Sequence, residues 1–268
     1  MALWDRFRRG GAARRRSGEA GARSATLPAA LPPTTVLGTT PAGRRVVAFR
    51  APGEDLLPWW QRLRDEHATT GLWPVLLGPD VEGLCRALPG SVLGGDAYDD
   101  DAELARAARL TVDGLRATWV QRLHDDADPL PPDLGGPFDP PDRLDPNPAA
   151  FTAAEAAGLV GLVPAAHGWQ VPAVLGWAGG CNYGMEPAEH VAVLRDWHAR
   201  YGAELVSLTG DQVLELLVAR PPADRDQAIA VAREQYGYCA DVVDQGIESV
   251  TALARHQVPA RSWYFWWD

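Results

Sequence analysis

Short apolar segments alternate along this chain with amphipathic segments, and this alternation restricts the fold more than any other feature of the sequence. The segment RRVVAFR (44–50) is followed by GEDLLPWWQRLRDEHATTG (53–71), and LWPVLLG (72–78) comes next. Apolar residues repeat every three or four positions in the middle segment, which indicates a helix with one buried face, whereas the flanking runs are typical of buried strands. The N-terminal part is therefore predicted to form a small β-α-β module.

A longer series of the same kind fills the C-terminal part. One of its helices begins at Pro187 and ends before Gly202, in keeping with the preference for proline in a first turn and glycine after a last turn. The β-α-β-β-α-β order is that of the ferredoxin-like arrangement, an antiparallel sheet with its helices on one face, so the predicted class is α+β. The expected elements are a strand at 171–177, a helix at 187–201, strands at 203–210 and 213–221, a helical region at 223–256 interrupted near Gly237, and a strand at 262–268.

Composition divides the chain into four parts. Residues 1–33 are rich in arginine, glycine and alanine and lack an apolar period, so we expect a disordered tail. Residues 34–124 hold the N-terminal α/β module. Aspartate and proline dominate residues 125–150, which favours an extended linker. The C-terminal domain takes up residues 151–268, and its first residues, TAAEAAGLV, favour a short helix that begins with a capping box.

A nine-residue pattern occurs twice, as LRDEHATTG (63–71) and as LRDWHARYG (194–202), and an apolar run follows each copy. Both copies place glycine where a helix would end and histidine in the last turn, where the helix dipole favours it. Two interpretations remain open, namely convergence on a stable helix end and an ancient duplication of a strand–helix–strand unit. Neither interpretation gives His67 or His198 a catalytic role.

Charge is distributed unevenly along the chain, and lysine does not occur. The net charge is −10, to which residues 1–50 contribute +8 (ten Arg against two acids) and residues 51–268 contribute −18 (fifteen Arg against 33 acids). The acidic body lacks the basic face that phosphate contacts need, so we expect no nucleic-acid partner. The lack of lysine excludes a Walker A motif, a Schiff base and a lysine-linked cofactor.

Cysteine usage and the length of the apolar runs bear on the compartment. Cys85, Cys181 and Cys239 are far apart in the sequence, which disfavours a zinc site or a disulfide framework and fits a reducing cytosol. The N-terminal segment has no apolar region of signal-peptide length, and no run reaches the roughly 18 apolar residues of a membrane span. We therefore predict a cytoplasmic protein with no cofactor, no metal centre and no membrane span, and we leave its oligomeric state open.

The glycine-rich loop GWAGGCNYG (176–184) allows more than one chemistry. Cys181 lies just before a predicted helix, where the pKa of a thiol is lowered, so it could act as a nucleophile with His167, His190 or His198 as its base. Backbone N–H groups of the same loop could instead bind an anion. The simplest alternative is a small side chain that fills a tight turn.

Acidic residues recur at helical spacing in EQYGYCADVVDQGIESV (234–250). Asp241, Asp244 and Glu248 lie on one side of the predicted helix, and paired carboxylates can bind a hard cation or serve as acid and base. The opposite side is apolar, so an ordinary amphipathic helix with a solvated acidic face explains the pattern equally well. Both interpretations stay open.

The aromatic run WYFWWD is the most unusual segment of the sequence. Alternation along a strand places Trp263, Phe265 and Trp267 on one face and Tyr264 and Trp266 on the other. One set can pack on the helices. The other set is either exposed, as the surface for a ligand or partner, or covered by the N-terminal module.

Several segments resemble the bacterial domain of unknown function 4253. They are GWAGGCNYG, HVAVLRDWHARYGAELVSLTGDQVLELLVARPP, AREQYGYCADVVDQG, LARH and SWYFWWD, which together cover roughly residues 165–268. The family usually has Trp in place of Cys181, and this difference favours Asn182 as the functional residue of the loop. The resemblance implies no activity, because none is established for the family. The polar positions that match, together with Trp266 of the aromatic run, are the candidate binding residues: Asn182, Asp211, Tyr238, Asp241, Asp244, Gln245, Trp266 and Asp268.

Two classes of function fit these observations. The first is a binding module for a basic protein partner, for example a toxin that this chain would neutralise, because an acidic body and an aromatic strand complement such a partner. The second is an enzyme of low turnover, in which Asp241, Asp244 and Asp268 gather near Asn182 around a cation or a polar small molecule. The second class requires these residues to meet in one concave pocket, and the catalytic residues of such an enzyme remain unassigned.

Overall fold

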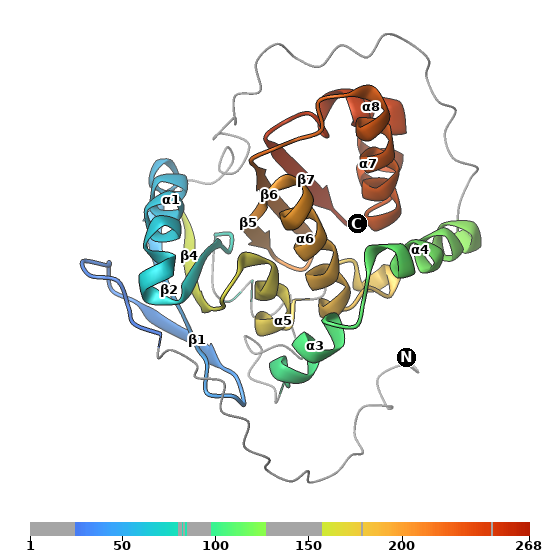
Figure 1. Ribbon diagram of the computed structural model, residues 1–268. Coiled ribbons are helices and arrows are strands. Elements are labelled where there is room, and N and C mark those ends of the chain that lie inside the picture. The colour runs from blue at the N-terminus through green and yellow to red at the C-terminus, as the bar shows by residue number, and fades with distance from the viewer. Residues whose placement is uncertain are drawn as a thin grey trace, which may run out of the picture.

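The structure is a computed structural model that describes residues 25–79, 82, 84, 98–126, 157–177, 179–247 and 249–268. Seven strands form one sheet in the order β1-β2-β4-β3-β5-β6-β7 (Figure 1). Neighbouring strands are antiparallel except for β3 and β5, which are parallel. The strands are β1 (Thr35–Thr39), β2 (Arg45–Pro52), β3 (Leu72–Leu76), β4 (Ala157–Pro164), β5 (Ala203–Thr209), β6 (Val213–Val218) and β7 (Ser262–Trp266).

The helices lie toward both ends of the sheet. Helix α1 lies beside β2 and β4, whereas α7 and α8 lie at the other end, beside β6 and β7 (Figure 1). The helices are α1 (Gly53–Thr70), α3 (Asp100–Ala107), α4 (Val112–Asp126), α5 (Val171–Leu175), α6 (Pro187–Tyr201), α7 (Arg225–Tyr238) and α8 (Val250–His256), with short 3-10 turns η4 (Gly168–Gln170) and η5 (Cys181–Tyr183) and a π-helical turn η6 (Val242–Ile247). The mixed α+β class is therefore confirmed.

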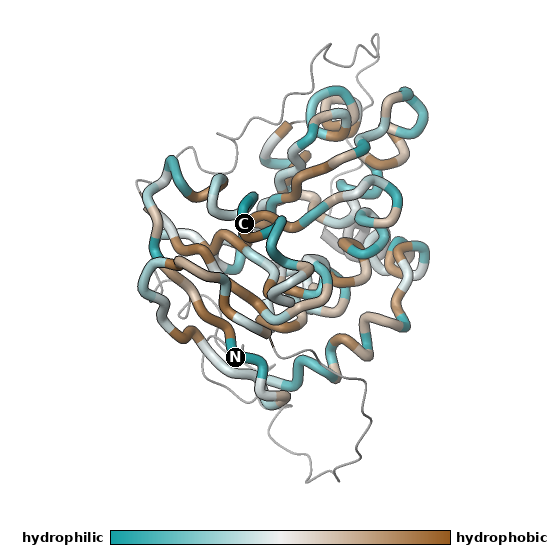
Figure 2. The backbone as a smooth tube through the Cα atoms, turned by 60° about the vertical axis from the view of Figure 1, so that its left-hand side comes forward, coloured by the Kyte–Doolittle hydropathy of each residue, from teal (hydrophilic) through white to brown (hydrophobic). Residues whose placement is uncertain are grey.

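Strand β4 joins the two parts of the chain. It lies between β2 and β3, with Phe49 of β2 opposite Val160, and Val75 of β3 opposite Gly161. The strand that follows the Asp/Pro-rich segment in sequence is thus inserted into the sheet built by the N-terminal part. The two parts share one sheet and one apolar core, and the apolar residues follow the strands through the middle of the molecule (Figure 2).

The ferredoxin-like order predicted for the C-terminal part is not confirmed. The segment 171–177 was predicted to be its first strand, but Val171–Leu175 forms helix α5. Pro172 lies in the first turn of α5, and Gly176 ends it in the left-handed conformation (φ 70°), which glycine adopts without steric cost. All five residues are buried, so the apolar run has no polar side from which a helical period could be recognised.

The first strand of the C-terminal part lies earlier, at β4, where we predicted a short helix. The run Ala157–Pro164 is buried along nearly its whole length because strands cover both of its edges and other elements cover its faces. Gly161 is required at this point: a Cβ there would approach Cδ1 of Leu77 to 2.6 Å. Strand β3 then separates β4 from β5, so the C-terminal strands do not form a four-stranded sheet of their own.

Other predicted elements are confirmed. The long helical region predicted at 223–256 breaks after Tyr238 into α7, η6 and α8. The predicted aromatic strand is β7. Residues 1–24, 127–156 and most of 80–97, including Cys85, lie outside the described residues, so the predicted tail and linker are not tested there.

The described chain begins before residue 34, where we placed the start of the N-terminal module. The Thr26 N–H donates to the Thr70 carbonyl (3.1 Å), and Arg62 donates to the Ala29 carbonyl (3.0 Å). Residues 25–33 are thus held against α1, and only the earlier part of the predicted tail is undescribed. Within the described residues, no helix combines the length and the apolar character needed to cross a bilayer.

Both copies of the repeated pattern form the predicted helix end. Gly71 ends α1 and Gly202 ends α6, both in the left-handed conformation (φ 68° and 61°). The settings differ, however. Helix α1 connects two strands, β2 and β3, that run parallel on either side of β4, whereas β5 runs antiparallel to the strand β4 that precedes α6. The local match therefore extends to the helix ends but not to the strand arrangement around them.

Candidate binding site at the end of strand β7

The end of β7 is held in place by hydrogen bonds from three other segments. The Trp267 N–H donates to the Gln212 carbonyl in the β5–β6 turn (3.0 Å), and the Asp268 N–H donates to Oδ2 of Asp241 (3.0 Å). The side-chain amide of Asn182, in η5, donates to the Asp268 carbonyl. The last residues of β7 therefore have a fixed position relative to the loop after α5 and the turn after α7.

Asp241 is the centre of this arrangement. It is only 2% exposed, and its Oδ1 accepts hydrogen bonds from the Tyr183 hydroxyl (2.7 Å) and from Nε2 of Gln245 (3.0 Å). Burial, and then the hydrogen bond to Asp241, raise the pKa of Tyr183. Each carboxylate oxygen already has a donor, so the buried charge is compensated by hydrogen bonds. We call Asn182, Tyr183, Asp241, Gln245 and Asp268 the β7 latch.

The glycine-rich loop packs against two tryptophan rings, and its glycines leave the space that these rings occupy. A Cβ on Gly179 would collide with the ring of Trp177, and a Cβ on Gly180 would approach Cδ1 of Trp267 to 2.7 Å. Gly180 also has positive φ (67°). The loop is therefore packed closely by its neighbours, which fits the prediction of a tight turn better than that of an open anion site.

Tyr238 lies in the core beneath the latch and not on the surface. Its hydroxyl is 2.6 Å from Nδ1 of His190, whose Nε2 is 2.8 Å from the Gly179 carbonyl. Both residues are fully buried, and burial raises the pKa of Tyr238 well above its usual value. As a candidate binding residue Tyr238 thus has no surface to offer, and it acts as a support for β7, because its ring packs edge-on against Phe265 and Trp267.

The remaining acidic candidates surround the same end of β7. Asp244 is exposed and accepts a hydrogen bond from the Tyr236 hydroxyl (3.1 Å), and burial together with this carboxylate raises the pKa of Tyr236 to about 12. Asp211 is half-buried in the β5–β6 turn, next to Gln212, the residue that receives the Trp267 N–H. The structure thus gathers most of the candidates predicted from sequence around one end of one strand.

The alternation predicted along β7 is confirmed. Trp263, Phe265 and Trp267 are buried, whereas Tyr264 is 44% exposed and Trp266 is half-buried. Strand β7 is the last strand of the sheet and pairs only with β6. One side of the strand therefore belongs to the core and the other side is partly exposed. At the outer edge, the Cys239 thiol donates to the Trp266 carbonyl and Asp241 accepts from the Asp268 N–H, so the part of this edge that has no partner among the described residues is at Ser262–Tyr264.

Glu215 belongs to the same face and was not among the predicted residues. It lies between Ser207 of β5 and Tyr264 of β7 in the register of the sheet. It is only 7% exposed, and burial raises its pKa to about 7, although a hydrogen bond with Ser207 acts in the opposite direction. The signal in the sequence is an acidic residue in the middle of the apolar run VLELLV, which is unusual for a buried strand.

The cysteine hypothesis receives no support from the contacts. Cys181 is exposed in η5, but His190, the nearest of the proposed bases in sequence, uses both ring nitrogens for Tyr238 and Gly179. Cys239 is buried, its pKa is raised by burial, and its thiol donates to the Trp266 carbonyl (3.0 Å). Within the described part of the chain, no three His, Cys, Asp or Glu side chains are grouped so that they could hold a metal ion.

Residues 159–268 match the family model "Domain of unknown function (DUF4253)". The match begins within β4 and covers everything that follows it, and it starts slightly earlier than the segments in which we recognised the resemblance. The comparison with curated proteins and the comparison with solved structures each found no match. The matched region includes the entire β7 latch but not β2 and β3, the two partners of β4 in the sheet.

Proposed function

We propose that this protein is a protein-binding module whose docking surface is the free part of the β7 edge together with the side of that strand that carries Tyr264 and Trp266. The observation that carries the proposal is the exposure of aromatic side chains on an edge strand: Tyr264 is 44% exposed and β7 has one sheet neighbour. Tyrosine and tryptophan are enriched in protein interfaces because they bury a large area with little loss of side-chain freedom.

The rigidity of the surface supports the same proposal. Trp267 and Phe265, whose side chains point to the opposite side from Tyr264 and Trp266, are packed against Tyr238, and the latch holds the strand end through Asp241. An ordered strand loses little entropy on binding, so its exposed backbone groups are suited to pairing with an extended segment of a partner. We infer that the partner adds a strand to the sheet beside β7.

The charges around β7 favour a basic partner. Asp211, Asp244 and Asp268 lie around the strand, whereas Arg261, just before it, is the nearest basic residue in the sequence. Lysine or arginine side chains that flank an extended apolar segment would complement these acids. A basic protein such as a toxin that this chain neutralises in the bacterial cytoplasm remains our preferred partner, and the scattered cysteines are consistent with that compartment.

The alternative of a low-turnover enzyme with a carboxylate-rich site has less support. Asp241 and Asp268 lie next to Asn182, as that hypothesis requires. However, the carboxylate of Asp241 already accepts three hydrogen bonds, and Asp244 is bonded to Tyr236 instead of facing Asp241. A cation at Asp241 would have to replace existing donors, which makes this proposal the weaker one.

The test is affinity purification of the full-length protein, carrying an N-terminal tag, from its native cytosol, with Tyr264→Ala and Trp266→Ala as variants. Val36→Ala is the matched control, because Val36 is equally exposed (46%) but lies on β1 at the opposite edge of the sheet. We expect a stoichiometric basic partner that the wild type and Val36→Ala retain and that both aromatic variants lose. Binding should weaken as the salt concentration rises.

Two results would contradict the proposal. One is a set of bound proteins that does not differ between the wild type and the aromatic variants. The other is a partner whose binding does not depend on salt, which would remove the argument from charge. In either case, a thermal-shift screen of divalent cations and metabolites would follow, because it addresses the enzyme alternative directly.

A further inference from the structure

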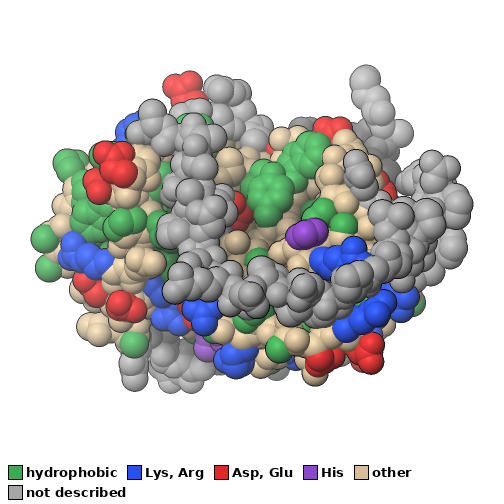
Figure 3. All heavy atoms as spheres, turned by 90° about the horizontal axis from the view of Figure 1, so that it is seen from above, with side chains coloured by type: hydrophobic (Ala, Val, Ile, Leu, Met, Phe, Trp, Pro, Cys, Tyr) green, Lys and Arg blue, Asp and Glu red, His purple; other side chains and the backbone are tan. Residues whose placement is uncertain are grey.

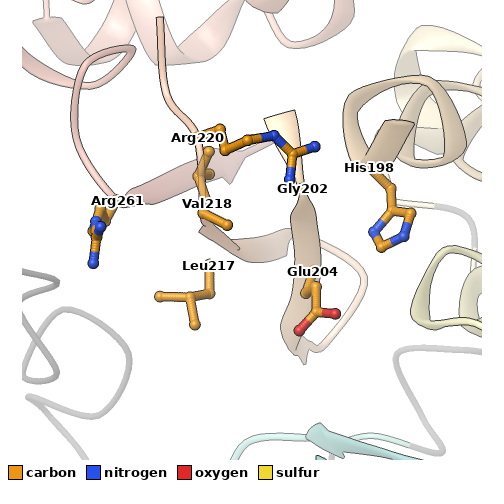
Figure 4. Close-up of a pocket in the computed structure, with 8 residues that line it drawn as sticks. His198, Gly202, Glu204, Leu217, Val218, Arg220 and Arg261 are labelled. Carbon is orange, nitrogen blue, oxygen red and sulfur yellow. The ribbon is translucent and has the colours of Figure 1, made fainter. Parts of the chain in front are cut away.

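A pocket opens at the other end of β7, away from the latch. Its lining comes from the end of α6, the start of β5, the end of β6 and the residue before β7 (Figure 4). Its volume is about 420 Å³, within the range of small-molecule sites. The residues that line it are His198, Gly202, Glu204, Leu217, Val218, Ala219, Arg220 and Arg261.

The pocket carries positive charge in a chain that is acidic overall. Glu204 is the only acid among the described residues that line it, and both of its carboxylate oxygens accept hydrogen bonds from Arg64, which neutralises it. Arg220 and Arg261 are exposed and form no ion pair within the described part of the chain. The net charge of the lining is therefore positive, although the whole chain has a net charge of −10.

Arg220 and Arg261 are among the described arginines that form no ion pair with a described acid, unlike Arg44 and Arg200. Arg44 pairs with Asp100 and Asp101, and Arg200 pairs with Asp196 and Glu234. By contrast, the side chain of Arg220 has one long hydrogen bond, to the Ala199 carbonyl at 3.4 Å, and that of Arg261 has none to a described residue. Where acids are in excess, two unpaired guanidinium groups at one pocket leave donors for a ligand.

His198 adds a further polar group. Its Nδ1 is 3.1 Å from the Ala203 carbonyl and donates to it, so Nε2 is the nitrogen left for a ligand. Arg261 lies on one side of Leu217, and Arg220 and Glu204 lie on the other (Figure 4). On the face of the molecule seen from above Figure 1, basic side chains lie among hydrophobic and acidic ones (Figure 3).

We propose that this pocket binds a small organic anion. Its carboxylate or phosphate group would pair with the guanidinium groups of Arg261 and Arg220, and its apolar part would lie on Leu217. The arrangement favours an elongated ligand over a single compact ion, because the two arginines flank an apolar residue instead of converging on one point. Carboxylates and phosphates share the oxyanion geometry that guanidinium groups recognise, so both belong in the test.

The test is isothermal titration calorimetry of the full-length protein with two probes, glutarate and inorganic phosphate, in a low-chloride buffer. The variants are Arg261→Ala and Arg220→Ala, and the control is Arg45→Ala, which removes the same charge from an exposed position on β2, at the far end of the sheet. We expect each pocket variant to weaken binding about tenfold, the loss typical for one charge-assisted hydrogen bond, and the control to remain unchanged.

The titrations with glutarate and phosphate distinguish a carboxylate ligand from a phosphorylated one. Binding of glutarate identifies a carboxylate ligand and binding of phosphate alone identifies a phosphorylated one; both support the site when the pocket variants lose them. The proposal is overturned when neither probe binds at about 10 mM or when Arg45→Ala weakens binding as much as Arg261→Ala. Tyr264→Ala should bind the probes normally, so failure here leaves the protein-docking proposal unaffected, and the reverse also holds.

Discussion

The two edge strands of the sheet, β1 and β7, differ in the regularity of their register and in their composition. Strand β1 is short and mostly exposed, contains Gly38, and has an irregular register between Val36 and Gly38. Strand β7 is aromatic, keeps a regular register with β6 and is fastened at its end by the latch. Irregular, glycine-containing edges discourage pairing with other chains, whereas a regular aromatic edge invites it. Under the proposed function, the irregular edge is protected against pairing and the regular edge is the one that pairs with a partner.

The largest effect should come from removing the strands between the two edges. A fragment of residues 157–268 lacks β2 and β3, so β4 loses both of its sheet partners and β5 loses β3. We expect no cooperative thermal unfolding by circular dichroism. A chain without residues 1–39, which lacks β1 and the segment held against α1 but keeps the other six strands, should still unfold cooperatively. A folded 157–268 fragment would show that the family-matched region does not depend on the N-terminal strands.

The next effect concerns the latch. Asp241→Ala removes three hydrogen bonds, from the half-buried Tyr183 and from the exposed Gln245 and Asp268, and we expect a loss of about 3 kcal/mol in the free energy of unfolding measured with urea. Near the β1 edge, Asp101→Ala removes an exposed partner of Arg44 and should cost less than about 1 kcal/mol. Equal losses for the two variants would mean that the β7 end is no more firmly held than the β1 hairpin.

Glu215 should make stability depend on pH at the β7 edge. Its pKa in the folded protein, about 7, lies above the value of about 4.5 for an exposed carboxyl, so the folded state binds the proton more tightly. Stability should therefore fall as pH rises from about 4.5 to 7, with a cost of roughly 2 to 3 kcal/mol at pH 8. Glu215→Gln should remove this dependence, whereas Glu54→Gln on the exposed side of α1 should not. Parallel pH profiles for wild type and Glu215→Gln would refute the assignment.

The smallest effects on stability belong to the exposed residues of the two edges. Tyr264→Ala and Val36→Ala should each change the free energy of unfolding by less than about 1 kcal/mol, because both side chains are nearly half exposed in the folded state. The two variants should then differ only in partner binding. A large destabilisation by Tyr264→Ala would make this residue part of the core and would weaken its role in docking.

Local sequence signals predicted the elements whose ends or faces are marked by proline, glycine or an alternating pattern. Pro187 and Gly202 bound α6, and the alternation of aromatic residues gave both faces of β7, because these signals depend only on neighbours in the sequence. A helix was expected where β4 lies and a strand where α5 lies. Both expectations are wrong because the two segments are short, apolar and buried, so neither shows a period. The insertion of β4 between β2 and β3 depends on contacts between distant residues, and no local pattern encodes it.

The candidate site was predicted in part for the same reasons. The match to the family singled out Asn182, Asp241, Gln245 and Asp268, which the structure brings together at the latch. Tyr238 was misplaced, because a tyrosine in a helical segment gives no sign of whether it faces solvent or the core. Glu215 was overlooked because its significance arises from burial between two neighbouring strands, which only the register of the sheet reveals.

The position of β4 also has a consequence for how the chain is made. A ribosome completes β2, α1 and β3 long before it reaches residue 157. In the folded sheet, however, β4 lies between β2 and β3, so these two strands have no common neighbour until β4 has been synthesised. The emerging N-terminal part thus exposes two apolar strand edges for the time needed to synthesise about eighty further residues. Nascent chains of this protein should depend on chaperones during that interval, and the dependence should end once β4 has entered the gap.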